Sequence, residues 1–241
     1  MIYVYKNLLC IYRLKEEAYV MNNHLIVTIS RQFGSGGKEI GRILAEKMNV
    51  PFYDKASIIQ ISKEQGITQE LLDQAEERSN DSLIYSLAMK QYVAKNGEIG
   101  TLPIYDKVYS VQSHIIQEAA KSGPCVIVGR SADYILKEFP YCVRFFIHAE
   151  IQKRLERAIE FYHLSPEESN ETYIRRKDQR RSNYHHYYND LGWGEAASYH
   201  MVLDSGEVEL DDCARMAWDY LRAYCKKNGL EFPPLSEESS R

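Results

Sequence analysis

The residues best suited to chemistry lie together near the beginning of the chain, in the run Gly34-Ser35-Gly36-Gly37-Lys38. Glycines let a backbone turn tightly and bring its N–H groups close to an anion. If a helix begins at this turn, its first N–H groups and its dipole add positive potential. The run therefore predicts a phosphate-binding turn, with candidate residues Gly34, Ser35, Gly36, Gly37, Lys38 and Glu39.

The regular phosphate-loop pattern, G-x-x-x-x-G-K-[ST], is matched only in part. Gly37 and Lys38 supply the final pair. Gln32 stands where the first glycine would fall, and Glu39 stands where a hydroxyl residue would follow. An ordinary tight connection between a strand and a helix is the alternative. Four small residues and a lysine between an apolar run and a helical pattern favour the phosphate site.

A second candidate follows another apolar run, 125–128, in the segment Gly129-Arg130-Ser131-Ala132-Asp133. Ligands of open α/β sheets bind beyond the carboxyl ends of the strands. The guanidinium of Arg130 can hold a phosphate through two hydrogen bonds. The alternative is a surface arginine paired with Asp133.

A third candidate is the segment 175–181, which carries five cations and one anion. Like charges three or four positions apart repel one another on a helix, so the segment is expected to have an anionic partner. Asp178 and Arg181 can share a face. A solvated basic face and an RNA-binding patch are the alternatives. The aromatic residues in 184–188, with Trp193, could stack on a base or form the contact of a mobile lid, and the sequence leaves both open.

The elements that must position these residues alternate between apolar strands and amphipathic helices. Strands are predicted at 25–29, 125–128 and 143–147, and a helix at Asp106–Lys121. This alternation predicts a parallel sheet with helices on both faces. Ser165-Pro166-Glu167-Glu168 has the features of a helix start and is expected to begin the helix that carries the basic segment. A last helix is expected at 209–224.

Composition restricts the classes of function that remain. The chain has 241 residues, and its net charge of −4 argues against a general nucleic-acid binder. Five scattered cysteines predict reduced, mostly buried thiols in a cytoplasmic protein. The apolar runs are too short to span a membrane. Segment 1–22 is expected to be an N-terminal extension, of which residues 1–20 would lie upstream of a natural start at Met21, and 226–241 is expected to be a disordered tail.

Three segments together resemble the cytidylate kinase-like family, a divergent branch of the P-loop nucleoside monophosphate kinases. They read TISRQFGSGGKEIGRILAEKMNVPFYDK, CVIVGRSADYIL and RRKDQRRSNYHHYY. The resemblance covers about Leu25 to Leu221. It implies a three-layer α/β/α fold with a central parallel sheet over 23–225. Within this domain it implies a helical acceptor-binding insertion at 57–105 and an arginine-rich lid at 163–198.

The resemblance also implies a reaction, the transfer of the ATP γ-phosphate to a nucleoside monophosphate such as CMP or dCMP. The turn would hold ATP with Mg²⁺, whose protein ligands are left open. The acceptor would be bound by Asp54, Arg130, Asp133 and Asp178, and the catalytic cations would be Lys38, Arg176, Arg180 and Arg181. An ungapped comparison with cytidylate kinases puts Gly37 where those proteins have their loop lysine. A kinase for another small phosphate acceptor and a nucleotide-binding regulator without turnover are the alternatives.

Overall fold

The computed structural model describes residues 23–78, 104–188 and 192–232. Its centre is a five-stranded parallel sheet with the strand order β2-β3-β1-β4-β5. The strands are β1 (Ile26–Arg31), β2 (Phe52–Tyr53), β3 (Cys125–Val128), β4 (Cys142–His148) and β5 (Met201–Asp204). β1 is the middle strand, and Ile26 lies opposite Cys125 on one side and Cys142 on the other. All five carboxyl ends therefore meet at one edge of the sheet.

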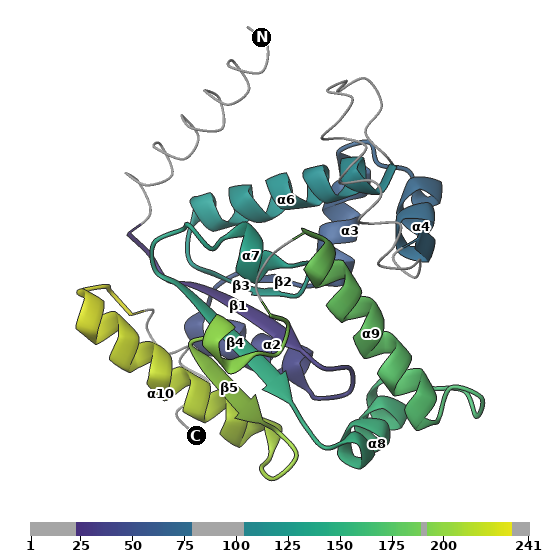
Figure 1. Cartoon of the computed structure of the whole chain (residues 1–241). Coiled ribbons are helices and arrows are strands. Elements are labelled where there is room, and N and C mark those ends of the chain that lie inside the picture. Colours follow the sequence, from purple (N-terminus) through teal and green to yellow (C-terminus); the bar gives the residue numbers. More distant parts are fainter. Residues whose placement is uncertain (1–22, 79–103, 189–191, 233–241) are drawn as a thin grey trace, which may run out of the picture.

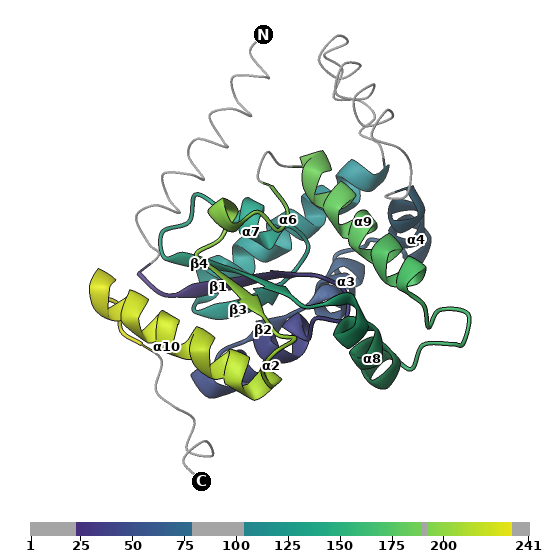
Figure 2. The ribbon, with the colours of Figure 1, turned by 60° about the horizontal axis from the view of Figure 1, so that its bottom comes forward.

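Helices cover both faces of this sheet, as continuous apolar strands require. On one face, α2 (Gly37–Met48) and α10 (Leu210–Asn228) pack against side chains such as Val27 and Ile29. On the other face, α3 (Lys55–Glu64), α6 (Ile104–Ser122) and α7 (Ala132–Ile135) surround Ile26 and Ile127. The two helical layers lie on opposite sides of the sheet (Figures 1 and 2). The predicted three-layer α/β/α architecture is confirmed.

Two further helices lie beyond the carboxyl ends of the strands. They are α8 (Ile151–Tyr162) and α9 (Glu171–Tyr188), which pack together around Phe33, Ala158 and Ile174. Figure 2 shows both beside the end of the sheet, with α9 extending toward α4 (Gln69–Arg78). A short 3-10 turn, η2 (Ala196–Ser198), precedes β5. The loop after β1 is thus enclosed between the sheet and this helix pair.

The predicted helix start at Ser165 is wrong, because α9 begins only at Glu171. Residues 165–169 form a single turn, and the Ser169 hydroxyl donates back to the Ser165 carbonyl at 2.8 Å. Asn170 then accepts the Tyr173 N–H at 2.9 Å. Such local side-chain hydrogen bonds compete with helix propagation and favour a helix start instead.

The predicted disordered tail from residue 226 is wrong at its beginning. α10 continues to Asn228, and Gly229 ends it in the left-handed conformation that favours glycine. Leu230 is buried, and Phe232 packs edge-on against Trp218 with 4.6 Å between ring centroids. Residues 226–232 therefore belong to the domain, whereas 233–241 lie outside the described residues.

Two other predictions also lie wholly or largely outside the described residues, namely the extension 1–22 and much of the acceptor insertion 57–105. α6 confirms the predicted helix at 106–121. Four cysteines in the described part of the chain are free and buried, as predicted, at positions 125, 142, 213 and 225. Of the helices that the structure describes, none combines the length and the apolar character needed to cross a bilayer.

Candidate functional site

The glycine turn after β1 is held in shape by close packing on every side. Gly34 and Gly36 have φ angles of 77° and 75°, which L-residues with side chains rarely adopt. A Cβ at Gly34 would lie 2.2 Å from the Arg154 carbonyl oxygen, and one at Gly36 would lie 2.4 Å from the Leu210 side chain. The hydroxyl of Ser205, just after β5, donates to the Ser35 carbonyl at 2.6 Å. Larger residues would therefore displace the turn from α8 and α10.

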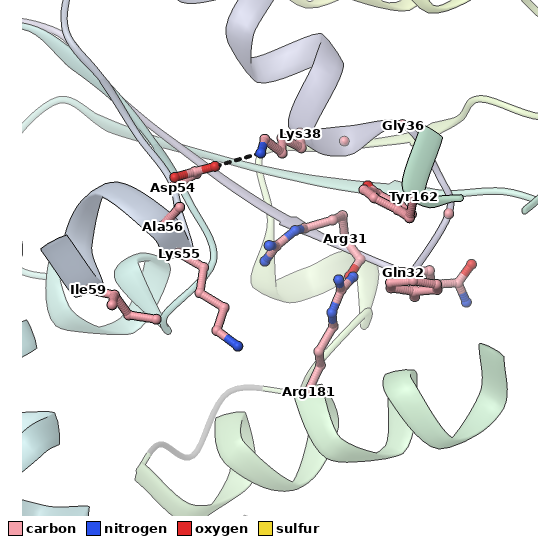
Figure 3. A pocket seen from close by; sticks show the side chains of 13 residues that line it. Arg31, Gln32, Gly36, Lys38, Asp54, Lys55, Ala56, Ile59, Tyr162 and Arg181 are labelled. Carbon is pink, nitrogen blue, oxygen red and sulfur yellow. Dashed lines mark hydrogen bonds and ion pairs between the residues drawn. The ribbon is translucent and has the colours of Figure 1, made fainter. Parts of the chain in front are cut away.

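This turn forms one wall of a cavity of about 320 Å³, which we call the loop cavity. α2 starts at Gly37, and no side chain caps its amino end. The first-turn N–H groups of a helix have no partners within the helix, so they are available to an anion. Side chains from other segments complete the walls, namely those of Asp54, Lys55, Ala56, Ile59, Tyr162 and Arg181. Figure 3 shows the tips of Arg31, Lys55 and Arg181 around one shared space.

Lys38 does not extend freely into this cavity, because its ammonium group lies 2.8 Å from the Asp54 carboxylate. Asp54 also caps α3 by accepting the Ser57 N–H at 3.0 Å. Burial alone would raise the pKa of Asp54, but the hydrogen bonds from Lys38 and Ser57 outweigh it, so the pKa is lowered. The same hydrogen bond raises the pKa of Lys38. The pair is therefore charged at neutral pH.

A second cavity of about 550 Å³, the arginine cavity, lies next to the first. The loop after β3 and α9 contribute four of its basic side chains, those of Arg130, Lys177, Arg180 and Arg181. Its aromatic side chains include Trp193 and Tyr184, whose ring centroid lies 5.9 Å from the Arg130 guanidinium carbon. The two cavities share Arg31, Phe33, Lys55 and Arg181. Cations thus stand where the cavities meet.

The electrostatic state of these cations indicates a site built for an anion. Burial, followed by the nearby Arg181 and Arg130, lowers the pKa of Arg31 to about 9. Burial also lowers the pKa of Arg181, whose Nη1 donates to the Arg31 carbonyl at 3.0 Å. With a pKa of about 9, Arg31 remains charged at neutral pH, and it experiences repulsion from the Arg181 guanidinium. A phosphate bound between them would relieve it.

A family model described as the cytidylate kinase-like family matches residues 26–207, about three quarters of the chain. The chain belongs to the cytidylate kinase-like family. Among solved structures, an uncharacterized protein from Eubacterium ventriosum ATCC 27560 has a TM-score of 0.62 at 23% identity, covering 83% of this chain and 99% of that one. This likeness supports the fold alone. No curated protein matches the chain.

Two solved kinases also resemble the chain, with lower scores. A shikimate kinase from Acinetobacter baumannii, in complex with shikimate, has a TM-score of 0.48 at 15% identity, with coverage of 85% of this chain and 97% of that one. A gluconokinase from Sinorhizobium meliloti 1021 has a TM-score of 0.47 at 15% identity, with coverage of 86% and 96%. Membership of the family, with its phosphate-loop geometry, supports a kinase, that is, a phosphotransferase.

The structure brings some of the sequence-predicted residues of this family member to the cavities. Gly34, Gly36, Gly37 and Lys38 line the loop cavity, whereas Ser35 is buried and Glu39 lines neither cavity. Asp54 lines the same cavity, and Arg130, Arg180 and Arg181 line the arginine cavity. Arg176 is exposed and lines neither cavity.

The two carboxylates predicted to bind the acceptor, Asp133 and Asp178, are engaged inside the protein. Asp133 is 2% exposed and lies 3.1 Å from both the Ser30 hydroxyl and the His185 Nε2. Asp178 accepts the Phe33 N–H at 2.6 Å and forms an ion pair with the buried Arg154. In this arrangement both hold α9 against the turn and the sheet.

The cavity-lining residues that sequence reasoning missed include Arg31, Lys55 and Tyr162. Lys55 follows Asp54 directly, so its position at the start of a helix beside the cavity was available as a signal. Tyr162 stacks near Phe33, with 5.2 Å between ring centroids. No local pattern distinguishes it from an ordinary aromatic residue at the end of α8.

The residues present also fit a Mg²⁺ ion that arrives with a nucleotide. Mg²⁺ in such sites takes one or two protein carboxylates together with phosphate oxygens and waters. Glu39, in the first turn of α2, has a buried carboxylate oxygen with no hydrogen-bond partner among the described residues. Asp54 supplies a second carboxylate at the loop cavity. The described part of the chain holds no cluster of three or more His, Cys, Asp or Glu side chains that could hold a metal ion.

Proposed function

We propose that the protein transfers the γ-phosphate of ATP to a nucleoside monophosphate, with CMP and dCMP as the preferred acceptors. The observation that carries this proposal is the pair of adjoining cavities, which share Arg31, Lys55 and Arg181. One is bordered by backbone amides suited to a polyphosphate. The other combines guanidinium groups with aromatic rings, which suits a nucleotide monophosphate.

The chemistry that such a site must supply is mainly positioning and charge neutralisation. The attacking oxygen of a monophosphate is already anionic, so the reaction needs no strong general base. The amides at the start of α2 would hold the donor phosphates, and Arg130 with Arg180 would orient the acceptor phosphate. Arg181 would neutralise charge between them. Magnesium held by Glu39 and Asp54 would add charge neutralisation at the donor phosphates.

The base of the acceptor would lie in the arginine cavity beside Tyr184 and Trp193. Stacking of a base on an aromatic ring is favourable and tolerates different bases. Selection of cytosine would then require hydrogen bonds to the edge of the base, and the buried Ser131 hydroxyl is available for one. The family supports cytidylate as the first acceptor to test.

The test is a coupled ADP-release assay with ATP, Mg²⁺ and each common nucleoside monophosphate. We expect turnover that is fastest with CMP or dCMP. Arg130→Ala should raise the acceptor KM roughly tenfold or more, as for a lost charge-assisted hydrogen bond, and leave the KM for ATP nearly unchanged. Arg175→Ala is the control for the loss of one arginine, because Arg175 is exposed and pairs with Glu171 on the surface of α9. Inactivity with every monophosphate, or an equal loss for both substrates, would contradict the proposal.

A nucleotide-binding regulator without turnover is a second candidate, favoured by the irregular loop. Gly37 stands where cytidylate kinases have a lysine, and Glu39 stands where they have a hydroxyl residue. Calorimetry distinguishes the two functions. Binding of ATP and CMP without ADP release would identify the regulator, whereas binding with ADP release would identify the kinase.

A further inference from the structure

Arg31 and Gly37 each have the residue type that a regular phosphate loop has at the other position. In the pattern G-x-x-x-x-G-K the first glycine precedes the lysine by six positions. When Gly37 is aligned with the lysine, the residue aligned with the first glycine is Arg31. A glycine thus occupies the position of the cation, and a cation occupies the position of a glycine. The exchange raises the question of which side chain of this loop meets the donor phosphates.

The two exchanged residues lie against each other in the structure. A Cβ added to Gly37 would lie 2.7 Å from the Arg31 Cβ and 3.0 Å from its Cγ. The φ angle of Gly37 is outside the left-handed region, so its backbone would accept another residue. Gly37 is therefore needed for the contact with Arg31 and not for the shape of the turn. A lysine at position 37 would compete with Arg31 for the same space.

A second glycine receives the other end of the Arg31 side chain. Gly129, at the end of β3, has a φ angle of 81°, and a Cβ there would lie 2.0 Å from the Arg31 Nη1. The side chain therefore passes over Gly37 with its stem and over Gly129 with its guanidinium group. It lines both the loop cavity and the arginine cavity. Figure 3 shows it directed across the loop cavity toward the side where Lys38 meets Asp54.

The charges around Arg31 and Lys38 differ in a way that matters for binding. The Lys38 ammonium is paired with Asp54 and its side chain is about half exposed. Among the described residues, no hydrogen bond or ion pair engages the Arg31 guanidinium. Burial, followed by the repulsion of Arg181 and Arg130, lowers its pKa, and the attraction of Asp54 offsets this only in part. An anion is the ligand that this arrangement lacks.

We propose that Arg31 takes over the role of the loop lysine and binds the donor phosphates at the junction of the two cavities. This inference rests on the proposed function for the identity of the donor, ATP. During transfer the bond from the acceptor oxygen to the γ-phosphorus forms, and the bond from that phosphorus to the leaving oxygen of ADP breaks. Arg31 keeps its proton throughout and stabilises the charge on the transferring group.

The decisive experiment restores the regular pattern by exchanging the two residues. Calorimetric affinities for ATP and inorganic triphosphate would be measured for Arg31→Gly, Gly37→Lys and the double variant. Each single variant should bind ATP roughly ten- to hundredfold more weakly, the first because a charge-assisted partner is lost and the second because the new side chain meets the Arg31 stem. The double variant restores the G-x-x-x-x-G-K spacing, with the exchanged cation at position 37 and Lys38 unchanged, and should regain most of the affinity. This coupling is the signature of a direct exchange.

Arg31→Met and Arg31→Lys distinguish a loss of ATP binding from a loss of folding. Methionine keeps an apolar stem over Gly37 and removes the charge, so it should fold normally and lose ATP affinity. Lysine should retain part of that affinity. Arg175→Ala is the control for a change in overall charge, and melting temperatures would be measured for every variant.

The outcomes separate this inference from the proposed function. Wild-type affinity in Arg31→Met, together with lost binding in Lys38→Met, would overturn the role of Arg31 and return it to Lys38. A double variant no better than its worse single variant would also overturn it. If wild type binds ATP but phosphorylates no monophosphate, the proposed function fails while the exchange experiment still decides the role of Arg31. If wild type binds neither ATP nor triphosphate, both fail.

Discussion

Replacement of Asp178 by alanine should destabilise the protein far more than its place in a basic, polar helix suggests. Its carboxylate accepts the Phe33 N–H at 2.6 Å and pairs with Arg154, whose side chain is only 6% exposed. The Arg154 Nη1 also donates to the Phe33 carbonyl at 3.3 Å. Asp178→Ala would therefore leave a buried guanidinium without its counterion and release the residue that begins the glycine turn.

The size of the effect follows from the burial of the pair. Removal of one partner from a buried ion pair costs about 3–5 kcal/mol of unfolding free energy. For a domain of this size, about 3 kcal/mol corresponds to a fall in melting temperature of roughly 6–12 °C. Asp178→Asn should cost less, because its amide oxygen can still accept the Phe33 N–H. Thermal and urea unfolding measure both values.

The matched control is Glu171→Ala on the same helix, which removes the exposed partner of Arg175. Its expected cost is below about 1 kcal/mol, as for surface ion pairs in general. If Asp178→Ala were as stable as this control, Arg154 would have to be solvated in solution. The reasoning from burial would then be refuted.

Three other predictions concern the turn, the cap of α3 and the thiols. Gly36→Ala should destabilise the protein by roughly 1–3 kcal/mol in urea unfolding, because the added Cβ is strained at positive φ and meets Leu210; wild-type stability would contradict the packing. Asp54→Ala should lower the free energy of unfolding by about 1 kcal/mol at pH 7, because the helix cap is lost. The folded pKa of Asp54 is lowered, so the stability difference between wild type and variant should be complete above about pH 4. It should fade as the pH falls through that lower pKa. Burial raises the pKa of Cys125 and Cys142 to about 12, so neither thiol should react with iodoacetamide at pH 8 until the protein is unfolded. Mass spectrometry measures the alkylation, and rapid labelling of the native protein would contradict their burial.

Much of the fold could be predicted from the sequence because the core strands are recognisable as apolar runs. The run 125–128 is continuously apolar, and all four residues are buried in β3 between two helical layers. The order of the strands could not be read in the same way, since nothing local in β1 says that it lies between β3 and β4. The sequence also predicts the wrong start for α9. The Asn170 side chain accepts the Tyr173 N–H, so the helix begins after Asn170 and not after Ser165.

The site was predictable where local pattern and function coincide, as in the glycine turn. It was less predictable where a side chain acts through a distant partner. Arg31 reads as a polar residue at the end of a strand, and its importance depends on the approach of Gly37 and Gly129. Asp133 and Asp178 read as ligands because they stand beside arginines. Their carboxylates instead satisfy His185 and Arg154, partners 52 and 24 positions away.

The way α9 is attached sets the order in which the domain should open. Of the described side chains of α9, Ile174 is the only apolar one that is fully buried, whereas α10 buries six residues against the core. Asp178, Arg181 and His185 attach α9 through hydrogen bonds and ion pairs. A helix held by a few polar contacts releases less apolar surface when it detaches, so its detachment costs less free energy than global unfolding. Backbone deuterium uptake should therefore proceed in α9 by local opening while α10 stays protected.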